Sequence, residues 1–165
     1  KKITKTIREV DTEHILILEG VNWASDITAL GKPFDDQLVY QFHKYWNGCE
    51  TEQIQSFLDF RDRWEVPIWC GETGENNYSW YRACSRLLRE HNIGWNFWPH
   101  KKRGEHPSPY NLVIPEEWAL VKKYTQTGER PSRETAQRAF SKLLDAIRID
   151  RCERDAEAIE SWLNP

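Results

Sequence analysis

One carboxylate stands out for its position. Glu72 follows a short apolar run and a glycine in the segment VPIWCGE. Gly71 would place this carboxylate at the end of a buried strand, where it is partly removed from water and needs polar partners. With a second carboxyl group about 5–5.5 Å away, such a group acts as the nucleophile of a retaining glycosidase. The structural alternative is that Glu72 caps the following helix or pairs with a basic side chain.

A histidine and a tyrosine are spaced to assist that carboxylate. His43 and Tyr45 lie two residues apart in the stretch LVYQFHKY, so on a strand both side chains point to the same face. On a face that reaches Glu72, the Tyr45 hydroxyl would donate to the carboxylate and keep it ionised. The alternative is a hydrogen-bonded core histidine beside a packed tyrosine.

Aromatic residues are the main oddity of the composition. The chain has 9 Trp although its mean hydropathy is -0.79, so its core has limited room for nine large rings. Exposed rings commonly bind the flat apolar faces of sugars, nucleobases or quaternary ammonium groups. Trp64, Trp80 and Trp118 are assigned to core packing. The rings near predicted strand ends are Trp23, Trp46, Trp95 and Trp98.

Alternating elements must position these side chains. Apolar runs predict strands at residues 14–18, 38–45, 66–70 and 93–98. Amphipathic segments predict helices at residues 52–64, 78–91, 115–121, 132–147 and 156–162. Strands that alternate with helices favour a parallel sheet built from right-handed crossover units. In such sheets the chemistry lies at the carboxyl ends of the strands.

The carboxyl ends of the predicted strands carry acidic and aromatic side chains: Glu19, Trp23, His43, Tyr45, Glu72 and Trp98. This set is typical of a carbohydrate site, in which Glu19, Trp23 and Trp98 would bind the sugar. The sequence shows no glycine-rich phosphate loop, no serine nucleophile elbow and no metal-ligand spacing among its histidines. The four cysteines form no C-x-x-C pair. We therefore expect no cofactor and no metal.

Length and charge narrow the class of protein further. A chain of 165 residues with a net charge of -3 fits one ordinary domain and argues against a nucleic-acid partner. No run of 18 apolar residues predicts a membrane span, and residues 1–6 do not begin a signal peptide. The absence of any Met indicates a processed chain or a piece of a longer one.

Four segments in order resemble one family. HILILEGVNW, VYQFHKYW, VPIWCGETGEN and IGWNFWPHKK are similar to glycoside hydrolase family 5, whose β-glucanases and β-mannanases are (β/α)8 barrels; the similarity spans about residues 7–102. The resemblance implies that Glu72 is the catalytic nucleophile and that His43 and Tyr45 are the active-site His-x-Tyr pair. It implies that Trp98 is the aromatic platform beside the scissile bond. Glu75, close by, does not match the nucleophile position.

The chain also departs from the family pattern. The family's acid/base glutamate lies in an Asn-Glu pair closing the fourth strand, and this sequence contains no Asn-Glu dipeptide. The family's upstream Arg and His positions are missing as well. Because a full (β/α)8 TIM barrel takes about 250 residues, the chain resembles the C-terminal half of one. Residues 1–128 would form the last four βα units and residues 129–165 a helical tail packed on the barrel, with the acid/base outside this chain.

The resemblance implies an endoglucanase-like or cellulase-like enzyme that cleaves internal β-1,4 linkages of a β-glucan with retention, outside the cell or in the periplasm. The alternatives are a β-mannanase, a noncatalytic carbohydrate-binding piece, or a half-barrel that serves assembly. A half-barrel leaves its inner face and two sheet edges bare. We therefore expect a partner, either the complementary N-terminal half of the barrel or a second copy of this chain.

Overall fold

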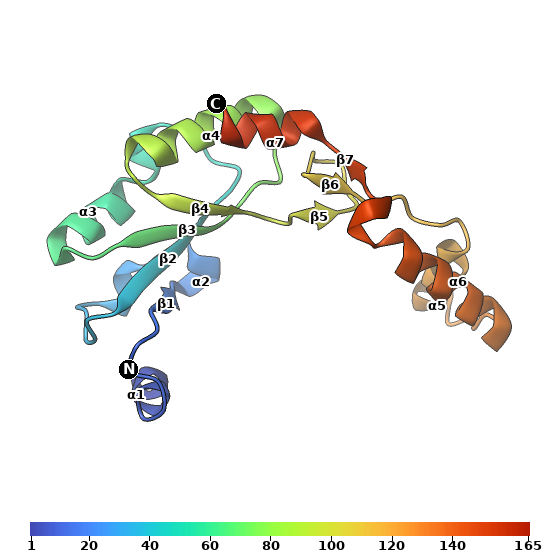
Figure 1. Ribbon diagram of the computed structural model, residues 1–165, viewed down its shortest axis with the longest axis horizontal. Helices are drawn as coiled ribbons and strands as arrows, with labels where there is room; N and C mark the ends of the chain where they lie inside the picture. The colour runs from blue at the N-terminus through green and yellow to red at the C-terminus, as the bar shows by residue number, and fades with distance from the viewer. The chain divides into compact units, whose positions relative to one another are not determined.

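The computed structural model describes residues 1–165 and contains two compact units. The first unit consists of Lys1–Trp98 together with Ser161–Pro165, and the second of Pro99–Glu160. The first contains a four-stranded sheet, and the second contains a three-stranded sheet and a helical pair (Figure 1). The expected division into a barrel part and a tail at residue 128 follows the family's organisation and stays a prediction.

The sheet of the first unit is parallel throughout. Its strands lie in the order β1-β2-β3-β4. Their bounds are β1 (Leu16–Glu19), β2 (Leu38–Lys44), β3 (Ile68–Thr73) and β4 (Gly94–Phe97). The four predicted strands and the parallel α/β arrangement are therefore confirmed, and β1 and β4 form the two edges.

The strand boundaries lie within three residues of the predicted ones, and two of the differences are informative. β1 begins at Leu16 rather than His14, because the Asp11 carboxylate accepts hydrogen bonds from the backbone N–H of Glu13 and of His14 and holds them in a turn. β3 continues to Thr73 instead of ending at Cys70. Glu72 therefore lies within the strand rather than after it.

Helices cover one face of this sheet. α3 (Gln55–Trp64) and α4 (Tyr78–Glu90) follow β2 and β3, as predicted, and lie on the same side of the sheet in Figure 1. Phe42 of β2 stacks on Phe57 with ring centroids 4.2 Å apart, and Tyr40 meets Phe60 edge-on at 4.9 Å. The Asn77 side chain caps α4 by accepting a hydrogen bond from the Trp80 N–H. This unit also contains α1 (Lys2–Arg8) and the short α2 (Val21–Ala24), neither of which was predicted.

The opposite face of the sheet is open within the unit. Along β2, Leu38, Tyr40, Phe42 and Lys44 are buried, whereas the intervening Val39, Gln41 and His43 are half-buried. On the edge strand β1, the Ile17 side chain is 54% exposed. In the barrel that the resemblance implies, the open face would be the interior. The alternation of burial assigns each β2 side chain to one face.

A β-bulge interrupts β3 beside the open face. Phe42 pairs with Cys70, but the next residue of β2, His43, pairs with Glu72. Gly71 is thus an extra residue in β3, and both Gly71 and Glu72 turn away from the buried helix side. The bulge places the Glu72 side chain on the same face as His43.

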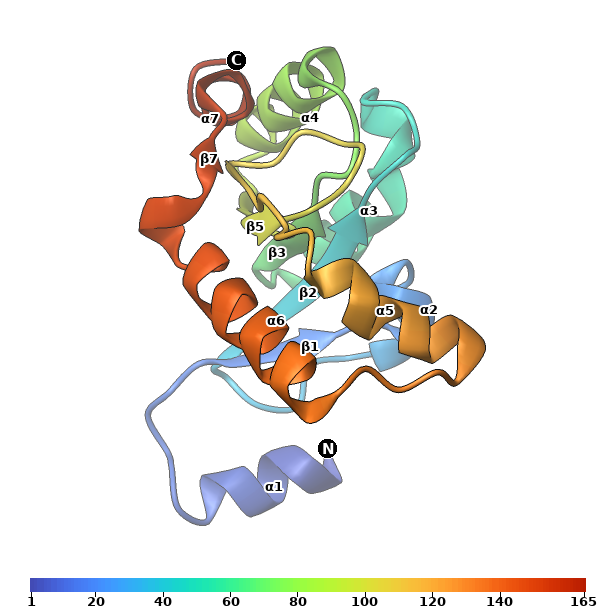
Figure 2. The ribbon, with the colours of Figure 1, turned by 90° about the vertical axis from the view of Figure 1, so that its right-hand side faces the viewer.

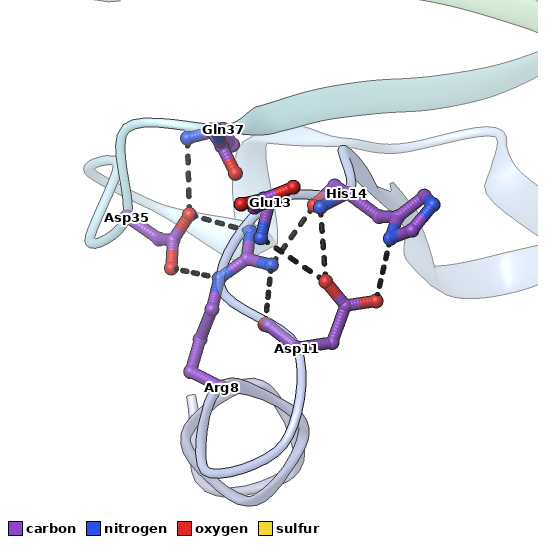
Figure 3. A network of polar contacts seen from close by, with 6 residues as sticks. All are labelled: Arg8, Asp11, Glu13, His14, Asp35 and Gln37. Carbon is purple, nitrogen blue, oxygen red and sulfur yellow. Dashed lines mark hydrogen bonds and ion pairs between the residues drawn. The ribbon is translucent and has the colours of Figure 1, made fainter.

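The amino end of the sheet is fastened by an ion-pair network (Figure 3). The Arg8 guanidinium donates to both carboxylate oxygens of Asp35, at 2.8 and 2.9 Å, and to the backbone carbonyls of Asp11 and His14. The Gln37 N–H also donates to Asp35. The hydrogen bond from Arg8 is the main cause that lowers the pKa of Asp35 to about 2. This network joins α1 to the segment that leads into β2.

The second unit combines short strands and a helical pair. Its sheet has the order β5-β6-β7, with β5 (Lys101–Lys102), β6 (Tyr110–Asn111) and β7 (Glu153–Arg154). α5 (Trp118–Thr127) and α6 (Arg133–Ala146) pack together, with the Trp118 ring edge-on to Phe140 at 5.2 Å (Figure 2). The helices predicted at 132–147 and 156–162 correspond to α6 and α7 (Ala156–Leu163), and none of the helices combines the length and apolar character needed to cross a bilayer.

Candidate active site

The Glu72 carboxylate lies at the centre of a polar group at the carboxyl ends of β2 and β3. The Tyr45 hydroxyl donates to Glu72 Oε2 at 2.8 Å, and His43 Nδ1 lies 3.4 Å from the same oxygen. The Glu72 side chain is 30% exposed and the His43 side chain 9% exposed. The structure therefore brings together three of the residues that the sequence placed at strand ends.

Tyr45 is fixed in its role as a hydrogen-bond donor. Burial, and then the hydrogen bond to Glu72, raise the pKa of the Tyr45 phenol far above its usual range. The phenol therefore stays protonated at physiological pH. It supplies a neutral donor that stabilises a negative charge on Glu72 without transferring a proton to it.

A pocket of about 570 Å³ opens over this group. Its lining residues are Asn22, Trp23, Ser25, His43, Lys44, Tyr45, Trp46, Asn47, Glu72 and Glu75. The Trp23 and Trp46 side chains are 89% and 71% exposed, so two large rings are available to a ligand. The Trp46 ring also stacks on Tyr45 at 5.2 Å. The sequence indicated Trp46 only as a ring near a strand end.

A strained turn holds Trp23 outward. Asn22, Trp23 and Ala24 have φ angles of 52°, 54° and 55°, three successive residues in the left-handed region. The turn is closed by a hydrogen bond from the Val21 N–H to the Asp26 carbonyl at 2.9 Å. Left-handed conformations of residues other than glycine cost free energy and cluster at functional sites. This turn buries Ala24 and exposes the indole of Trp23 to solvent.

A buried lysine anchors the loop that carries Tyr45 and Trp46. Lys44 is only 3% exposed, and its Nζ donates to Asn47 Oδ1 at 2.7 Å and to the Gly48 carbonyl at 2.5 Å. The ammonium also lies over the Trp80 ring, whose Nε1 donates to the Asn47 carbonyl. Trp80 therefore packs against the core, as assigned, and also ties this loop to α4.

Two predicted site residues lie outside the pocket lining. Glu19 is exposed at the end of β1, where it pairs in register with Gln41. Trp98 follows β4, is 50% exposed, and donates its backbone N–H to the Thr73 carbonyl at 2.8 Å. Their assignment to sugar binding stays a prediction.

The arrangement suits attack by a carboxylate on a ligand held against aromatic rings. One oxygen of Glu72 accepts a hydrogen bond from the Tyr45 hydroxyl and lies 3.4 Å from His43 Nδ1, and Trp23 and Trp46 face the same pocket. A second carboxylate, Glu75, also lines the pocket, on a left-handed residue with φ 51°. No group of three or more His, Cys, Asp or Glu side chains is arranged to hold a metal ion.

Comparisons with known proteins identify a matching family. Residues 1–104 match the sequence profile described as "Cellulase (glycosyl hydrolase family 5)". A search of curated proteins finds no significant match.

Several solved structures share the fold. An endoglucanase is 20% identical, with a TM-score of 0.56, over 66% of this chain and 46% of its own. The endoglucanase Cel5A of Pseudomonas stutzeri is 18% identical, with a TM-score of 0.52, over 61% and 40%. The cellulose synthase subunit Z of Clostridioides difficile is 18% identical, with a TM-score of 0.53, over 66% and 48%. The chain thus spans less than half the length of each of these structures, and its sheet matches part of a TIM barrel.

Proposed function

We propose that this chain, which belongs to glycoside hydrolase family 5, carries the nucleophile half of an active site that hydrolyses internal β-1,4 linkages of a neutral glucan. The observation that carries the proposal is the Glu72 carboxylate, held by the Tyr45 hydroxyl at 2.8 Å beside His43 Nδ1 at 3.4 Å. The neutral Tyr45 phenol orients the carboxylate and leaves its charge available for attack.

The proposed reaction has two steps. Glu72 attacks the anomeric carbon, the bond to the leaving oxygen breaks, and an acid residue protonates that oxygen, which leaves a glycosyl ester on Glu72. Water, deprotonated by the same residue acting as base, then hydrolyses the ester and restores the original anomeric configuration. Following the family pattern, the acid/base residue is expected from outside this chain.

The substrate assignment rests on the rings and on the sequence. Trp23 and Trp98 would stack on sugar faces, and Glu19 would accept hydrogen bonds from hydroxyl groups. Glucan is preferred to mannan, which differs in the orientation of the 2-hydroxyl group, because GETGEN and IGWNFWP resemble the endoglucanase branch of the family. A polymeric substrate implies an extracellular or periplasmic enzyme.

We expect a second set of strands to complete the barrel. β1 and β4 are open edges of the four-stranded sheet, and Ile15 and Ile17 on β1 and its approach are 63% and 54% exposed. Open parallel edges are templates for pairing. The preferred partner is the complementary half of the same barrel rather than a second copy, which would supply a second Glu72 and no acid/base. A stable monomer with full near-ultraviolet dichroism would contradict this expectation.

Covalent trapping tests the function directly. A 2-deoxy-2-fluoro-β-cellobioside with a dinitrophenolate leaving group needs no acid catalyst, so the chain can be tested even without the acid/base residue. We expect mass spectrometry to find one fluoroglycosyl group on the peptide that contains Glu72, and none on the Glu72→Gln variant.

The other outcomes separate the alternatives. Faster labelling by the mannose-configured reagent would overturn the glucan assignment. Binding of cello-oligosaccharides with no adduct would identify a noncatalytic carbohydrate-binding piece. An adduct on another residue, such as Glu75, would show that the nucleophile is assigned wrongly.

A further inference from the structure

Gln41 contacts the far side of the His43 ring. The side-chain nitrogen of Gln41 lies 3.0 Å from His43 Nε2, and His43 Nδ1 lies 3.4 Å from Glu72 Oε2. The three side chains therefore form a line from amide to imidazole to carboxylate on the open face of the sheet. Gln41 itself is not among the residues that line the pocket.

The chemistry of this line fixes the imidazole proton. An amide N–H can donate to His43 Nε2 only if that nitrogen keeps its lone pair. The ring is then neutral, and its single proton is on Nδ1, the nitrogen that faces Glu72. A histidine in this state directs a neutral N–H toward the carboxylate oxygen 3.4 Å away, rather than a full positive charge.

The Gln41 amide lies over Gly71 of the neighbouring strand β3, where the absence of a side chain leaves room for it. A Cβ atom at Gly71 would lie 2.0 Å from Cδ and 2.4 Å from Oε1 of Gln41. Any other residue at Gly71 would therefore displace the amide from its place across β3. The bulged glycine and the glutamine form a matched pair, and this geometry is independent of the hydrogen bond to His43.

We infer that Gln41 is a positioning residue that holds His43 as the neutral tautomer with its proton on Nδ1, directed at Glu72. The consequence for catalysis rests on the proposed function. Nδ1–H orients the Glu72 carboxylate, and the absence of a full positive charge on the ring keeps that carboxylate nucleophilic. Loss of the Gln41 contact would allow the ring to take the other tautomer or a second proton.

The ionisable groups around His43 do not supply a donor to Nε2. Glu72 on β3 faces the ring, Glu75 lines the same pocket, and Glu19 on β1 is in register with Gln41. Ionised carboxylates only accept hydrogen bonds. Lys44 of β2 lies on the opposite, buried face, and Tyr45, which follows β2, donates to Glu72. The Gln41 amide is therefore the donor placed against Nε2.

Nuclear magnetic resonance of the full chain labelled with 15N-histidine tests the inference without any substrate. Long-range proton–nitrogen spectra between pH 5 and pH 8 report which ring nitrogen of His43 carries the proton. We expect the Nδ1–H form in the parent chain and a mixture of tautomers in Gln41→Met, which keeps the side-chain volume. In the isosteric Gln41→Glu, we expect the doubly protonated ring to persist to higher pH. Gln126→Glu, an exposed position on α5, is the matched control for the charge change.

The glycine pair supplies a second, independent variant. Gly71→Ala should displace the Gln41 amide and reproduce the tautomer mixture of Gln41→Met. Gly94→Ala introduces a comparable clash with the Trp69 ring instead, where the added Cβ would lie 2.0 Å from Cζ3 and its three nearest atoms all belong to Trp69. We expect Gly94→Ala to leave the His43 tautomer unchanged. A parent chain with the proton on Nε2, or a Gln41→Met variant with an unchanged tautomer, would overturn the inference.

Kinetics then test the positioning role. The rate of fluoroglycosyl adduct formation should fall about five- to tenfold in Gln41→Met, an effect the size of one hydrogen bond, with little change in the concentration of reagent needed for half-saturation. In Gln41→Glu the acid limb of the rate profile should move to higher pH. An unchanged rate with an altered tautomer would refute the positioning role. If the parent chain forms no adduct, the proposed function fails, while the tautomer result still decides what Gln41 does.

Discussion

Two carboxylates at opposite ends of the same sheet have different surroundings. Asp35, at the amino end, accepts two hydrogen bonds from the Arg8 guanidinium and one from the Gln37 N–H. Glu72, at the carboxyl end, is held by a phenol and lies beside an imidazole. Asp35 forms an ion pair with a permanently charged guanidinium, whereas Glu72 accepts a hydrogen bond from a neutral phenol. An ion-paired carboxylate stabilises the fold. A carboxylate that is held only by a neutral donor keeps its charge available for chemistry.

The largest expected effect is at the carboxyl end. Glu72→Gln should lower the turnover of dinitrophenyl β-cellobioside by roughly 10³-fold or more, because an amide cannot form the covalent intermediate. The thermal midpoint should stay the same or rise, since the variant removes a partly buried charge. A variant that retains activity within tenfold of the parent would show that Glu72 is not the nucleophile and that its role does not differ from that of Asp35.

Removal of the phenol donor should have an intermediate effect. Tyr45→Phe keeps the ring that stacks on Trp46 and deletes one hydrogen bond to a charged group, so the rate on the same substrate should fall about 10- to 100-fold. The loss should appear in kcat, because the donor contacts the reacting carboxylate. Tyr124→Phe, at an exposed tyrosine on α5, is the matched control for the loss of a phenol hydroxyl. An unchanged rate in Tyr45→Phe would argue against this role.

At the amino end the expected effect is on stability alone. The pKa of Asp35 is lowered from 3.8 to about 2, so its contribution is present above about pH 4 and is lost as the pH falls toward 2. Asp35→Asn should lower the urea midpoint at pH 7 and make its decline between pH 4 and pH 2 shallower than in the parent. The exposed neighbour Asp36 provides the control variant Asp36→Asn. Equal acid slopes in Asp35→Asn and the parent would contradict the assignment.

The smallest expected effect is a difference in the alkylation rates of two cysteines, Cys70 in the middle of β3 and Cys49 after β2. Burial raises the pKa of Cys70, in the middle of β3, to about 12, whereas a hydrogen bond from the Cys84 thiol lowers the pKa of Cys49. Iodoacetamide at pH 8 should therefore label Cys49 well before Cys70, with little change in stability. Peptide mapping measures both rates, and denatured chain serves as the reference in which both thiols react. Equal labelling rates of Cys49 and Cys70 in the folded chain would show that the Cys70 thiol is accessible and not buried within the sheet.

Much of the scaffold could be predicted because its signals are local. Short apolar runs followed by polar residues identified the four strands, and the strand-end rule brought His43, Tyr45 and Glu72 to one edge. These inferences need only alternation, strand length and the topology of parallel sheets. The core assignment of Trp80 also agrees with the structure, where this ring packs against the buried cluster.

The missing parts depend on contacts between distant residues or on unusual backbone. Arg8 and Asp35 are 27 residues apart, and no periodicity connects them. The turn at Trp23 uses left-handed residues that are not glycine, which turn propensities do not predict. The β-bulge could not be predicted from a strict two-residue alternation either. Cys70 faces the helices, so regular alternation would place Glu72, two residues later, on the helix side rather than on the open face.

That extra residue has a consequence for how related sequences are aligned. If Gly71 were deleted, Cys70, Glu72 and Thr73 would form a regular strand, and the glutamate would still emerge beside His43. The Gln41 amide would then lose the space that it occupies over Gly71, where an added Cβ would lie 2.0 Å from its Cδ. A single-residue gap at this point should therefore covary with position 41: relatives whose strand is one residue shorter should carry a small side chain there, and relatives that keep the glycine have room for an amide.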